Sequence, residues 1–566
     1  MPTTPRSRRH LPAAPFAALL LAVSLPCQTG TVHTGTSPGN VHLSSGWTRS
    51  LAAQPDGTLW CLLREDDGSG TAAGRTLRLF ASSDQGANWA LVTDTPTIGD
   101  GRGALAAGRE CNVLHVSWCA VDSGTYYNLY HQAFDTATGQ WIGTPDVLLT
   151  GTTADDQYYT NDIAVSELGT IGIAFNTHRT PVLSGFSGWS GGLFVKRAAD
   201  AMFQGPYRCN TDSYGMLASM QAVGETFHLS FRTNTGLYGI RYRAFDAANL
   251  QFTTNADVPI YGSNQSAMRA TNSSTIASDR DGNLYVLYSV GSPNPAGGAL
   301  EVAFASAASG YSTWVTSLVE TDAALTAGNV TYQHYTLARA ENGAVLVVFA
   351  KASESYQNLW FRILSPDPVT GGASVVPDPA TTPAIPLIQT TEADSFQRVD
   401  GLRAEALHSG AMIAWSGNPS SRPNGGVDFL LLSTAARTVS WGTGCQGSLA
   451  ARPRLQSQTL PQIGQSFDFG VTDAPASAPA VVFGGLGCLL PPFDLGTLGM
   501  TGCEVFFTPL SSSFLLTDPT GAGSLSIAIP SGIGGGFELQ FGGLVLAPTA
   551  NPGGAVSTNA LSICVN

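Results

Sequence analysis

Five basic side chains stand at repeated positions of a pattern that recurs along this 566-residue chain. Arg49 and Arg102 precede the first apolar segment of a repeat, whereas Arg64, Arg232 and Lys351 follow the second. Guanidinium and ammonium groups bind carboxylate, sulfate and phosphate groups. If the repeats bring these positions together, an anionic ligand is the expected partner, because an acidic protein of net charge −13 would then concentrate its few cations in one place.

Groups that can move protons occupy equivalent positions in other repeats. His178 follows a second segment, whereas Tyr214 and His334 precede first segments. An imidazole and a phenol can serve as general base and general acid. Taken singly, each has a structural reading: a histidine on the surface or with its hydrogen bonds satisfied, and a tyrosine that packs with its hydroxyl bonded to the backbone. Single arginines have one too, as partners of nearby acids such as Glu65, Asp66, Asp67 and Glu110.

The recurring pattern is a short apolar strand, a polar turn that usually holds glycine, and a second alternating strand that mostly ends on an aromatic residue. It occurs at residues 51–63, 105–118, 163–175, 220–231, 276–288, 337–349 and 402–415. The positions that close these segments are 55 to 66 residues apart. A period of this size made of strands alone indicates propeller blades. We therefore expect an all-β chain with a seven-bladed β-propeller over residues 40–438.

This fold would position the candidate residues. The two strands of each hairpin are antiparallel, so the start of the first strand and the end of the second lie at one end of the blade. Seven such hairpins would place these ends around a single funnel. We expect the funnel to be lined by the basic, imidazole and phenol groups described above.

A turn motif supports the propeller. Ser82, Asp84, Gly86 and Trp89 have the spacing of an Asp-box, and residues 133–141, 244–252 and 304–314 look like decayed copies at equivalent places. The motif is similar to the BNR or Asp-box repeats of sialidase-type propellers. We expect it to close an outer hairpin through side-chain to backbone hydrogen bonds and to perform no chemistry.

The segment TRSLAAQPDGTLWCLLRE resembles the arginine-containing inner strand of sialidases. The resemblance implies that Arg49 is a carboxylate-binding arginine and that Asp66 or Asp67 is the acid/base. A sialidase-like exo-glycosidase is therefore one alternative.

A second resemblance covers residues 150–310 and is to BNR-repeat polysaccharide lyases of the ulvan-lyase type. It rests on DDQYYTNDIAVSELGTIGIAFNTHRTP and SYGMLASMQAVGETFHLSFRTNTGLYGIRYRAFD. It implies that Arg232 holds a uronate carboxylate while His178 and Tyr214 divide the proton transfers of a β-elimination. Further substrate-binding residues would be Arg49, Arg64, Arg102, Tyr238, His334 and Lys351.

We therefore expect a carbohydrate-active propeller that binds an acidic polysaccharide or a sialylated glycan and cleaves a polysaccharide as a lyase. The alternatives are the sialidase-like activity and a non-catalytic glycan-binding or cell-surface protein. The net charge argues against a nucleic-acid partner. We expect a monomer and no cofactor, and the absence of CxxC and HxxxH pairs predicts no dedicated zinc site.

The two ends of the chain have other compositions. Residues 1–28 read as an export signal, with Cys27 as an alternative lipidation site, so we expect a secreted, periplasmic or cell-surface protein without a transmembrane segment. Residues 440–566 are nearly free of charge and rich in glycine and proline, and they predict a C-terminal β-sandwich accessory module. In an exported chain, two disulfides are expected in each of two cysteine sets: 61, 111, 119 and 209, and 445, 488, 503 and 564.

Overall fold

The computed structural model describes residues 27–565 with gaps in the chain. The segments outside the description are 36–40, 44–48, 70, 72–73, 85, 98–101, 111, 122–126, 152–156, 179–182, 184, 187–189, 212–214, 234–238, 255, 262–268, 280, 292–297, 323–334, 340–344, 368, 377, 381–382, 390–401, 408–409, 418–424, 434–436, 442, 463, 487–492 and 531–536. The expected export signal therefore lies outside the described residues, apart from Cys27 and Gln28.

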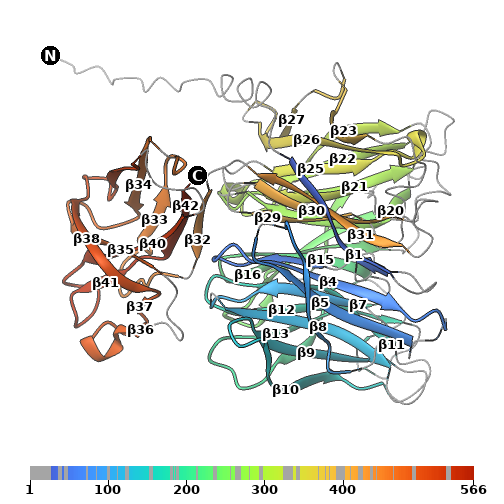
Figure 1. Cartoon of the computed structure of the whole chain (residues 1–566), viewed down its shortest axis with the longest axis horizontal. Coiled ribbons are helices and arrows are strands. Elements are labelled where there is room, and N and C mark those ends of the chain that lie inside the picture. Colours follow the sequence, from blue (N-terminus) through green and yellow to red (C-terminus); the bar gives the residue numbers. More distant parts are fainter. Residues whose placement is uncertain are drawn as a thin grey trace.

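The chain is all-β, and its sheets up to residue 433 are antiparallel units consistent with propeller blades (Figure 1). Each of the seven hairpins expected from the sequence is present as an antiparallel pair. The inner pairs are β3 (Leu51–Ala53) with β4 (Leu59–Asp66), β7 (Arg102–Ala107) with β8 (Val113–Val121), β11 (Gln157–Val165) with β12 (Ile171–His178), β15 (Gly215–Val223) with β16 (Thr226–Thr233), β20 (Arg269–Ser278) with β21 (Leu284–Gly291), β24 (Tyr335–Arg339) with β25 (Val345–Ala350), and β29 (Leu402–Leu407) with β30 (Gly410–Gly417).

Further strands extend each pair outward. They are β5 (Arg75–Ser82) and β6 (Ala90–Asp94); β9 (Tyr127–Asp135) and β10 (Gln140–Leu149); β13 (Gly191–Lys196) and β14 (Gln204–Arg208); β17 (Gly239–Asp246), β18 (Gln251–Phe252) and β19 (Val258–Tyr261); β22 (Gly298–Ala305) and β23 (Val315–Asp322); and β26 (Asn358–Pro366), β27 (Ala373–Val376) and β28 (Ile385–Gln389). The strand β2 (Val41–Leu43) pairs with β4 on the same edge as β3. A single parallel pair between Gln157 and Tyr127 joins the sheets of β7–β10 and β11–β14. Two 3₁₀ turns, η2 (Ala307–Ser309) and η3 (Ala352–Glu354), complete this part.

The last of these sheets takes its outer strand from the beginning of the chain. The strand β31 (Gly426–Ser433) pairs with β30 on one side and with β1 (Cys27–Thr34) on the other. The sheet order is therefore β1-β31-β30-β29. This sheet includes residues that precede position 40, where the sequence placed the start of the propeller.

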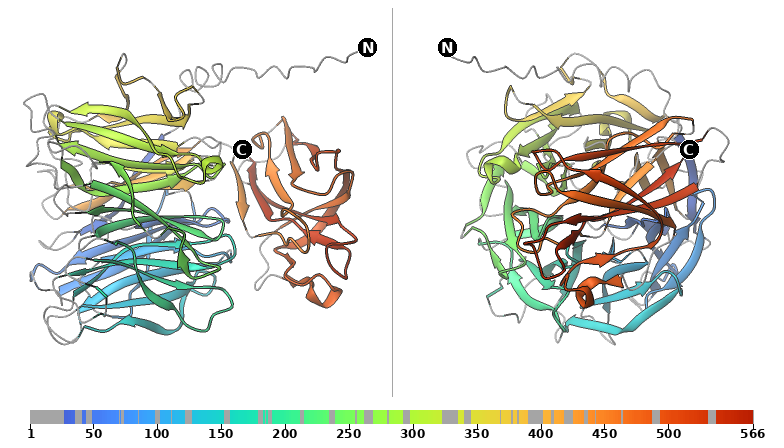
Figure 2. Two further views of the ribbon diagram at one scale, coloured as in Figure 1. Left: turned by 180° about the vertical axis from the view of Figure 1, so that it is seen from behind. Right: turned by 90° about the vertical axis from the view of Figure 1, so that its left-hand side faces the viewer.

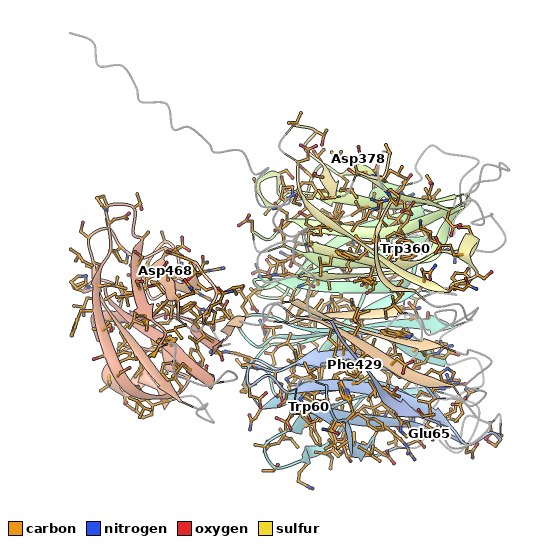
Figure 3. The ribbon with its side chains drawn as sticks, turned by 45° about the horizontal axis from the view of Figure 1, so that its top comes forward. Trp60, Glu65, Trp360, Asp378, Phe429 and Asp468 are labelled. Atoms are coloured by element: carbon orange, nitrogen blue, oxygen red, sulfur yellow. A yellow bond between two sulfur atoms is a disulfide. The ribbon has the colours of Figure 1, made fainter. Side chains whose placement is uncertain are left out.

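The hydrophobic cores lie between consecutive sheets, as stacked blades require. Trp60 and Trp118 belong to the core between the β2–β6 and β7–β10 sheets, and Phe429 and Leu63 belong to the core between the last sheet and the first. Figure 3 labels Trp60 and Phe429 in these two cores. Each of the remaining hydrophobic cores lies between two sheets that are consecutive in the chain. The innermost strands also contact one another in sequence, with β29 contacting β3. This series of contacts closes on itself, and Figure 2 shows the rounded outline seen along its axis.

The turn at Asp84 has the hydrogen bonds expected of it. The Ser82 hydroxyl donates to Asp84 Oδ1 at 2.8 Å and accepts from the Gly86 amide at 2.7 Å, while Asp84 Oδ1 accepts from the Asn88 amide at 2.9 Å. Gly86 has φ +86°, and a Cβ there would lie 2.5 Å from the Phe429 ring. The turn thus fixes β5 against β6 and packs on the last sheet.

A second unit begins at β32 (Arg437–Trp441). Its larger sheet has the order β32-β42-β40-β35-β38 with β41 beside β40, and its smaller sheet has the order β33-β34-β39. The strands are β33 (Arg454–Ser457), β34 (Ser466–Thr472), β35 (Pro479–Leu486), β38 (Thr508–Leu516), β39 (Gly523–Ala528), β40 (Phe537–Leu546), β41 (Ala555–Ser557) and β42 (Ala560–Val565), with β36 (Phe493–Asp494), β37 (Glu504–Val505) and the turn η4 (Leu495–Leu498) at one side. The larger and the smaller sheet both contribute to one core that contains Phe467, Phe469 and Phe541.

The second unit lies against one end of the ring (Figure 2). It contacts the turns of inner hairpins: Arg109 binds Glu504, Arg454 lies 3.8 Å from Glu167, and the Ser562 hydroxyl donates to the Pro55 carbonyl at 3.4 Å. The starts of the inner strands therefore lie at the opposite end of the ring. No helix in the described part of the chain has the length and apolar character needed to cross a bilayer.

The cysteines correct one expectation. Cys445 and Cys503 form a disulfide in the second unit. In the first unit, however, Cys61 and Cys209 are free, buried thiols, and the Cys119 thiol donates to the Arg102 carbonyl. The prediction of two disulfides in the first set was therefore wrong, because Cys61 and Cys209 are small apolar side chains in separate hydrophobic cores and Cys119 is a buried thiol on β8. Cys111 and Cys488 lie outside the described residues.

Candidate functional site

Arg49 crosses the axis of the ring. Its Nη2 donates to the Met220 carbonyl at 3.1 Å, and its Nε lies 3.6 Å from Asp162 Oδ1. Asp162 in turn accepts from the Met220 amide at 2.8 Å and the Ile163 amide at 2.9 Å. Arg49 precedes β3, whereas Asp162 and Met220 belong to β11 and β15, so this network ties three inner strands together. The Arg49 guanidinium is thus bound by groups of the protein itself.

Arg102 stacks on an aromatic pair near the same axis. Its guanidinium carbon lies 4.0 Å from the centre of the Tyr159 ring, which is itself 5.2 Å from the Tyr127 ring. Arg102 begins β7, so it lies at the end of the ring remote from the second unit. A guanidinium over an aromatic ring is held there by a cation–π interaction.

His178 and Arg232 lie at the open ends of two neighbouring hairpins, at the same end of the ring remote from the second unit. His178 is the last residue of β12 and pairs with Gln157 at the start of β11. Arg232 is the next-to-last residue of β16, at the end of the hairpin away from its turn, and lies opposite Met216 of β15. The strands β11 and β12 both contact β15, so the two positions belong to adjacent sheets.

Three predicted site residues, Tyr214, Tyr238 and His334, lie outside the described residues, and for His178 the description covers the backbone only. The proton-transfer roles of His178 and Tyr214 therefore remain predictions.

Arg64 has the structural role that the alternative reading gave it. Its Nε and Nη2 donate to the two oxygens of Asp66 at 2.8 and 3.0 Å. Burial alone would raise the pKa of the Asp66 carboxyl, but the hydrogen bonds and charges of His42 and Arg64 hold that pKa well below its usual value. Asp66 is therefore an ionised ion-pair partner at neutral pH and is not protonated to serve as an acid.

Lys351 is also engaged with acids. Its Nζ lies 3.6 Å from Glu320 Oε2 and 3.8 Å from Glu354 Oε1, and it lies 4.9 Å from the centre of the Trp360 ring. Glu320 also accepts from the buried Arg362 at 2.8 Å. Three of the five basic residues expected to attract an anion, Arg49, Arg64 and Lys351, are thus paired with acids in this structure.

Sequence reasoning missed a chain of titratable groups that runs from two buried histidines to the partly exposed Asp146. His115 Nδ1 lies 3.2 Å from His131 Nε2, and His131 Nδ1 lies 3.1 Å from Asp146 Oδ2. Each residue sits on a different strand, β8, β9 or β10, so no local motif marks the group; only the alternation of His115 with apolar neighbours could have shown that it points into a core. Within the described residues, no group of three or more His, Cys, Asp or Glu side chains is arranged to hold a metal ion.

Comparisons with known proteins give distant structural similarities only. No family model matches the chain. No curated protein matches it in sequence. Among solved structures, an α-L-arabinanase of Penicillium chrysogenum complexed with arabinobiose is 11% identical over 72% of this chain and 99% of its own, with a TM-score of 0.38. A polysaccharide lyase of family PL25, an ulvan lyase, is 9% identical over 69% and 94%, with a TM-score of 0.38. The hydrazine synthase of Kuenenia stuttgartiensis is 14% identical over 60% and 81%, with a TM-score of 0.36. Similarities of this extent assign no activity to the chain.

Proposed function

We propose that the protein is an exported seven-bladed β-propeller that binds an acidic polysaccharide at the end of its ring remote from the C-terminal unit. We propose further that it cleaves this polysaccharide by β-elimination, and that the C-terminal unit is a β-sandwich accessory module. The closed series of inter-sheet cores supports the blade count, and the disulfide Cys445–Cys503 supports an oxidising, extracytoplasmic location.

The observation that carries the proposal is the shared position of His178 and Arg232. They end the second strands of adjacent hairpins, at the end of the ring where Arg102 also begins its strand. A base and a cation on neighbouring strands meet the first two requirements for removing a proton next to a carboxylate. Tyr214 precedes β15 directly and would complete the set as the acid.

The proposed reaction keeps its atoms in balance. The base removes the proton on the carbon α to the uronate carboxylate, and Arg232 stabilises the charge that develops on the carboxylate. The electron pair then forms a carbon–carbon double bond as the bond to the leaving sugar oxygen breaks. The acid supplies a proton to that oxygen. The products are a new chain end with a hydroxyl group and an unsaturated uronate.

The contacts of Arg49 and Asp66 weigh against the sialidase alternative. That activity would need Arg49 to hold the substrate carboxylate, yet Arg49 binds Asp162 and the Met220 carbonyl. It would also need a protonated acid, yet the pKa of Asp66 is held low by His42 and Arg64. The lyase proposal uses neither residue for chemistry.

The proposal is tested by incubating the purified protein with uronate-containing polymers and with sialylated glycans. The expected result is ultraviolet absorbance from an unsaturated uronate and no release of sialic acid. His178→Ala and Arg232→Ala should each lower the rate roughly 100-fold or more. Arg197→Ala, which removes a guanidinium from an ion pair with Asp200 in a turn between β13 and β14, should leave the rate unchanged.

Two outcomes would contradict the proposal in different ways. Cleavage that neither His178→Ala nor Arg232→Ala slows would place the active site elsewhere. Affinity for the polymer without any turnover would leave the glycan-binding alternative in its place.

A further inference from the structure

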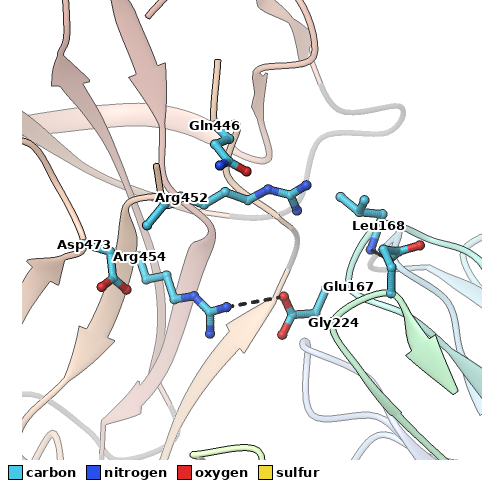
Figure 4. A pocket seen from close by; sticks show the side chains of 9 residues that line it. Glu167, Leu168, Gly224, Gln446, Arg452, Arg454 and Asp473 are labelled. Atoms are coloured by element: carbon cyan, nitrogen blue, oxygen red, sulfur yellow. Dashed lines mark hydrogen bonds and ion pairs between the residues drawn. The ribbon is translucent and has the colours of Figure 1, made fainter. Parts of the chain in front are cut away.

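The C-terminal unit and the ring enclose a cavity at the end opposite to the proposed active site. The cavity has a volume of about 380 Å³ and opens to solvent. Residues of the ring, including Glu167 and Leu168, form one side, and residues of the C-terminal unit form the other (Figure 4). A volume of this size is within the range of small-molecule sites, roughly 300–1,000 Å³.

The ring side of the cavity is held rigid by Glu225. Its carboxylate accepts from the Ser166 hydroxyl at 2.5 Å, the Leu168 amide at 3.1 Å and the Thr170 hydroxyl at 2.7 Å. These bonds fasten the turn between β11 and β12 to the next hairpin. The same turn presents Glu167 to the C-terminal unit, where its Oε2 lies 3.8 Å from Arg454 Nη2.

The other side presents a cation with no partner in the described part of the chain. Arg452 extends into the cavity toward Leu168 (Figure 4), and no hydrogen bond or ion pair joins it to a described residue. Pro453, which is buried, separates Arg452 from Arg454 and fixes the backbone between them. Nearby, the Gln446 side chain donates to the Leu449 carbonyl at 2.7 Å, so its amide oxygen can accept a hydrogen bond.

The lining of the cavity, with two arginines among three carboxylates, favours a ligand that carries one anionic group for Arg452 and several hydroxyl groups. Arg454 compensates Glu167, and Glu225 is satisfied by its three donors. Arg452 remains as an anchor for a planar anion, and Asp473 and Gln446 remain as acceptors. A simple inorganic anion would use only the arginine and would face the acidic groups without compensation. A sugar acid can place its carboxylate on Arg452 and donate its hydroxyls to the carboxylates.

We propose that this cavity is a second binding site, which takes a uronic acid unit with its carboxylate on Arg452. It is separate from the end of the ring where cleavage is proposed, and its existence does not depend on that activity. A chain bound there would hold the protein on an acidic polysaccharide while the opposite end remains free.

The test is a calorimetric titration of the full-length protein with glucuronate at low ionic strength, with glucose as the neutral counterpart. We expect glucuronate to bind and Arg452→Gln to weaken this binding at least tenfold, because a charge-assisted bidentate contact is lost. Arg197→Gln is the matched control, since it removes the same group outside the cavity, and its affinity should equal that of the original protein. Thermal unfolding of both variants checks that they are folded.

Equal affinity of Arg452→Gln and the original protein would overturn the proposal, as would the absence of glucuronate binding at millimolar concentrations. Glucose binding as tight as that of glucuronate would overturn the role of the carboxylate. Titrating His178→Ala and Arg232→Ala separates the two sites: these variants should retain the cavity's glucuronate affinity, which Arg452→Gln loses, whether or not the proposed cleavage takes place.

Discussion

His115 and His131 share a hydrogen bond of 3.2 Å inside the core between two sheets, and His131 continues to Asp146 at 3.1 Å. Asp146 is an acceptor, so His131 Nδ1 carries a proton and donates it. His131 Nε2 then accepts from His115 Nδ1. This sequence of donors and acceptors is complete with both imidazoles neutral, and a further proton on either ring would have to be accommodated in a buried site.

We predict from this arrangement that the protein loses stability in mild acid. Burial lowers the pKa of His115 to about 3, and it also lowers the pKa of His131, against an unfolded value of about 6.5. The unfolded chain therefore binds more protons below pH 6.5, so this contribution is fully present above pH 6.5 and is lost progressively as the pH falls toward 3. For His115 alone the loss should reach about 2 kcal/mol by pH 5. Urea unfolding between pH 7 and pH 5 measures it.

His115→Gln provides the control for this prediction, because glutamine cannot take up a proton in this range. The slope of unfolding free energy against pH should become shallower in the variant. A part of the slope should remain, since burial also lowers the pKa of His228 to about 3. An unchanged slope would show that His115 does not titrate differently in the folded and unfolded states.

Arg49→Met should destabilise the protein without weakening glycan binding. The substitution leaves Asp162, which is nearly buried, without its cation, a loss that costs about 3–5 kcal/mol in a fully buried pair. A quarter of the Arg49 side chain is exposed, so we expect a smaller cost of about 1–3 kcal/mol. Chemical denaturation of Arg49→Met, Asp162→Asn and the double variant measures the coupling. Strictly additive effects, or a selective loss of glycan affinity in folded Arg49→Met, would refute the structural role.

The repeated hairpins could be predicted from the sequence because each is a local pattern. Residues 51–63 show it: an apolar strand, the turn around Gly57 with φ +89°, and a second strand whose alternate residues enter two different cores. Asp84 could be read as a turn residue for the same reason, since every partner of its carboxylate lies within four positions.

Contacts between distant residues could not be read in this way. Lys351 was expected to face a ligand, but its partner Glu320 lies on a strand of the preceding sheet. Arg109 meets Glu504 across 395 positions of sequence. The first cysteine set shows the same limit, because membership in separate cores, which keeps Cys61 and Cys209 apart, is a property of the whole ring. The charged residues and cysteines in the sequence therefore indicated that ion pairs and disulfides could form. They did not determine which residues would be partners.

The strand β1 should be needed for closure of the ring. It pairs with β31 from Cys27↔Leu432 to Thr34↔Gly426, and Val32 is buried in the core between the last sheet and the first. Removing residues 1–34 should cost at least about 3 kcal/mol, through lost apolar burial and ladder hydrogen bonds. It should also favour aggregation, because β31 becomes an exposed edge. Removing residues 1–26 is the matched control and should leave thermal unfolding and sedimentation unchanged, whereas equal stability of both truncations would refute the role of β1.

Reduction should weaken the C-terminal unit selectively. The Cys445–Cys503 bond closes a loop with a sequence separation of 58, for which chain entropy predicts a stabilisation of about 4 kcal/mol. The thiols of Cys61 and Cys209 are buried in the ring, and burial raises the pKa of Cys209 to about 12, so neither is expected to react with a thiol reagent while the ring is folded. Dithiothreitol should therefore lower the unfolding transition of the C-terminal unit while the ring retains its own. The variant Cys445→Ala with Cys503→Ala should unfold at the lower temperature with or without the reductant; a transition in it that still moves on reduction would locate the sensitive bond elsewhere.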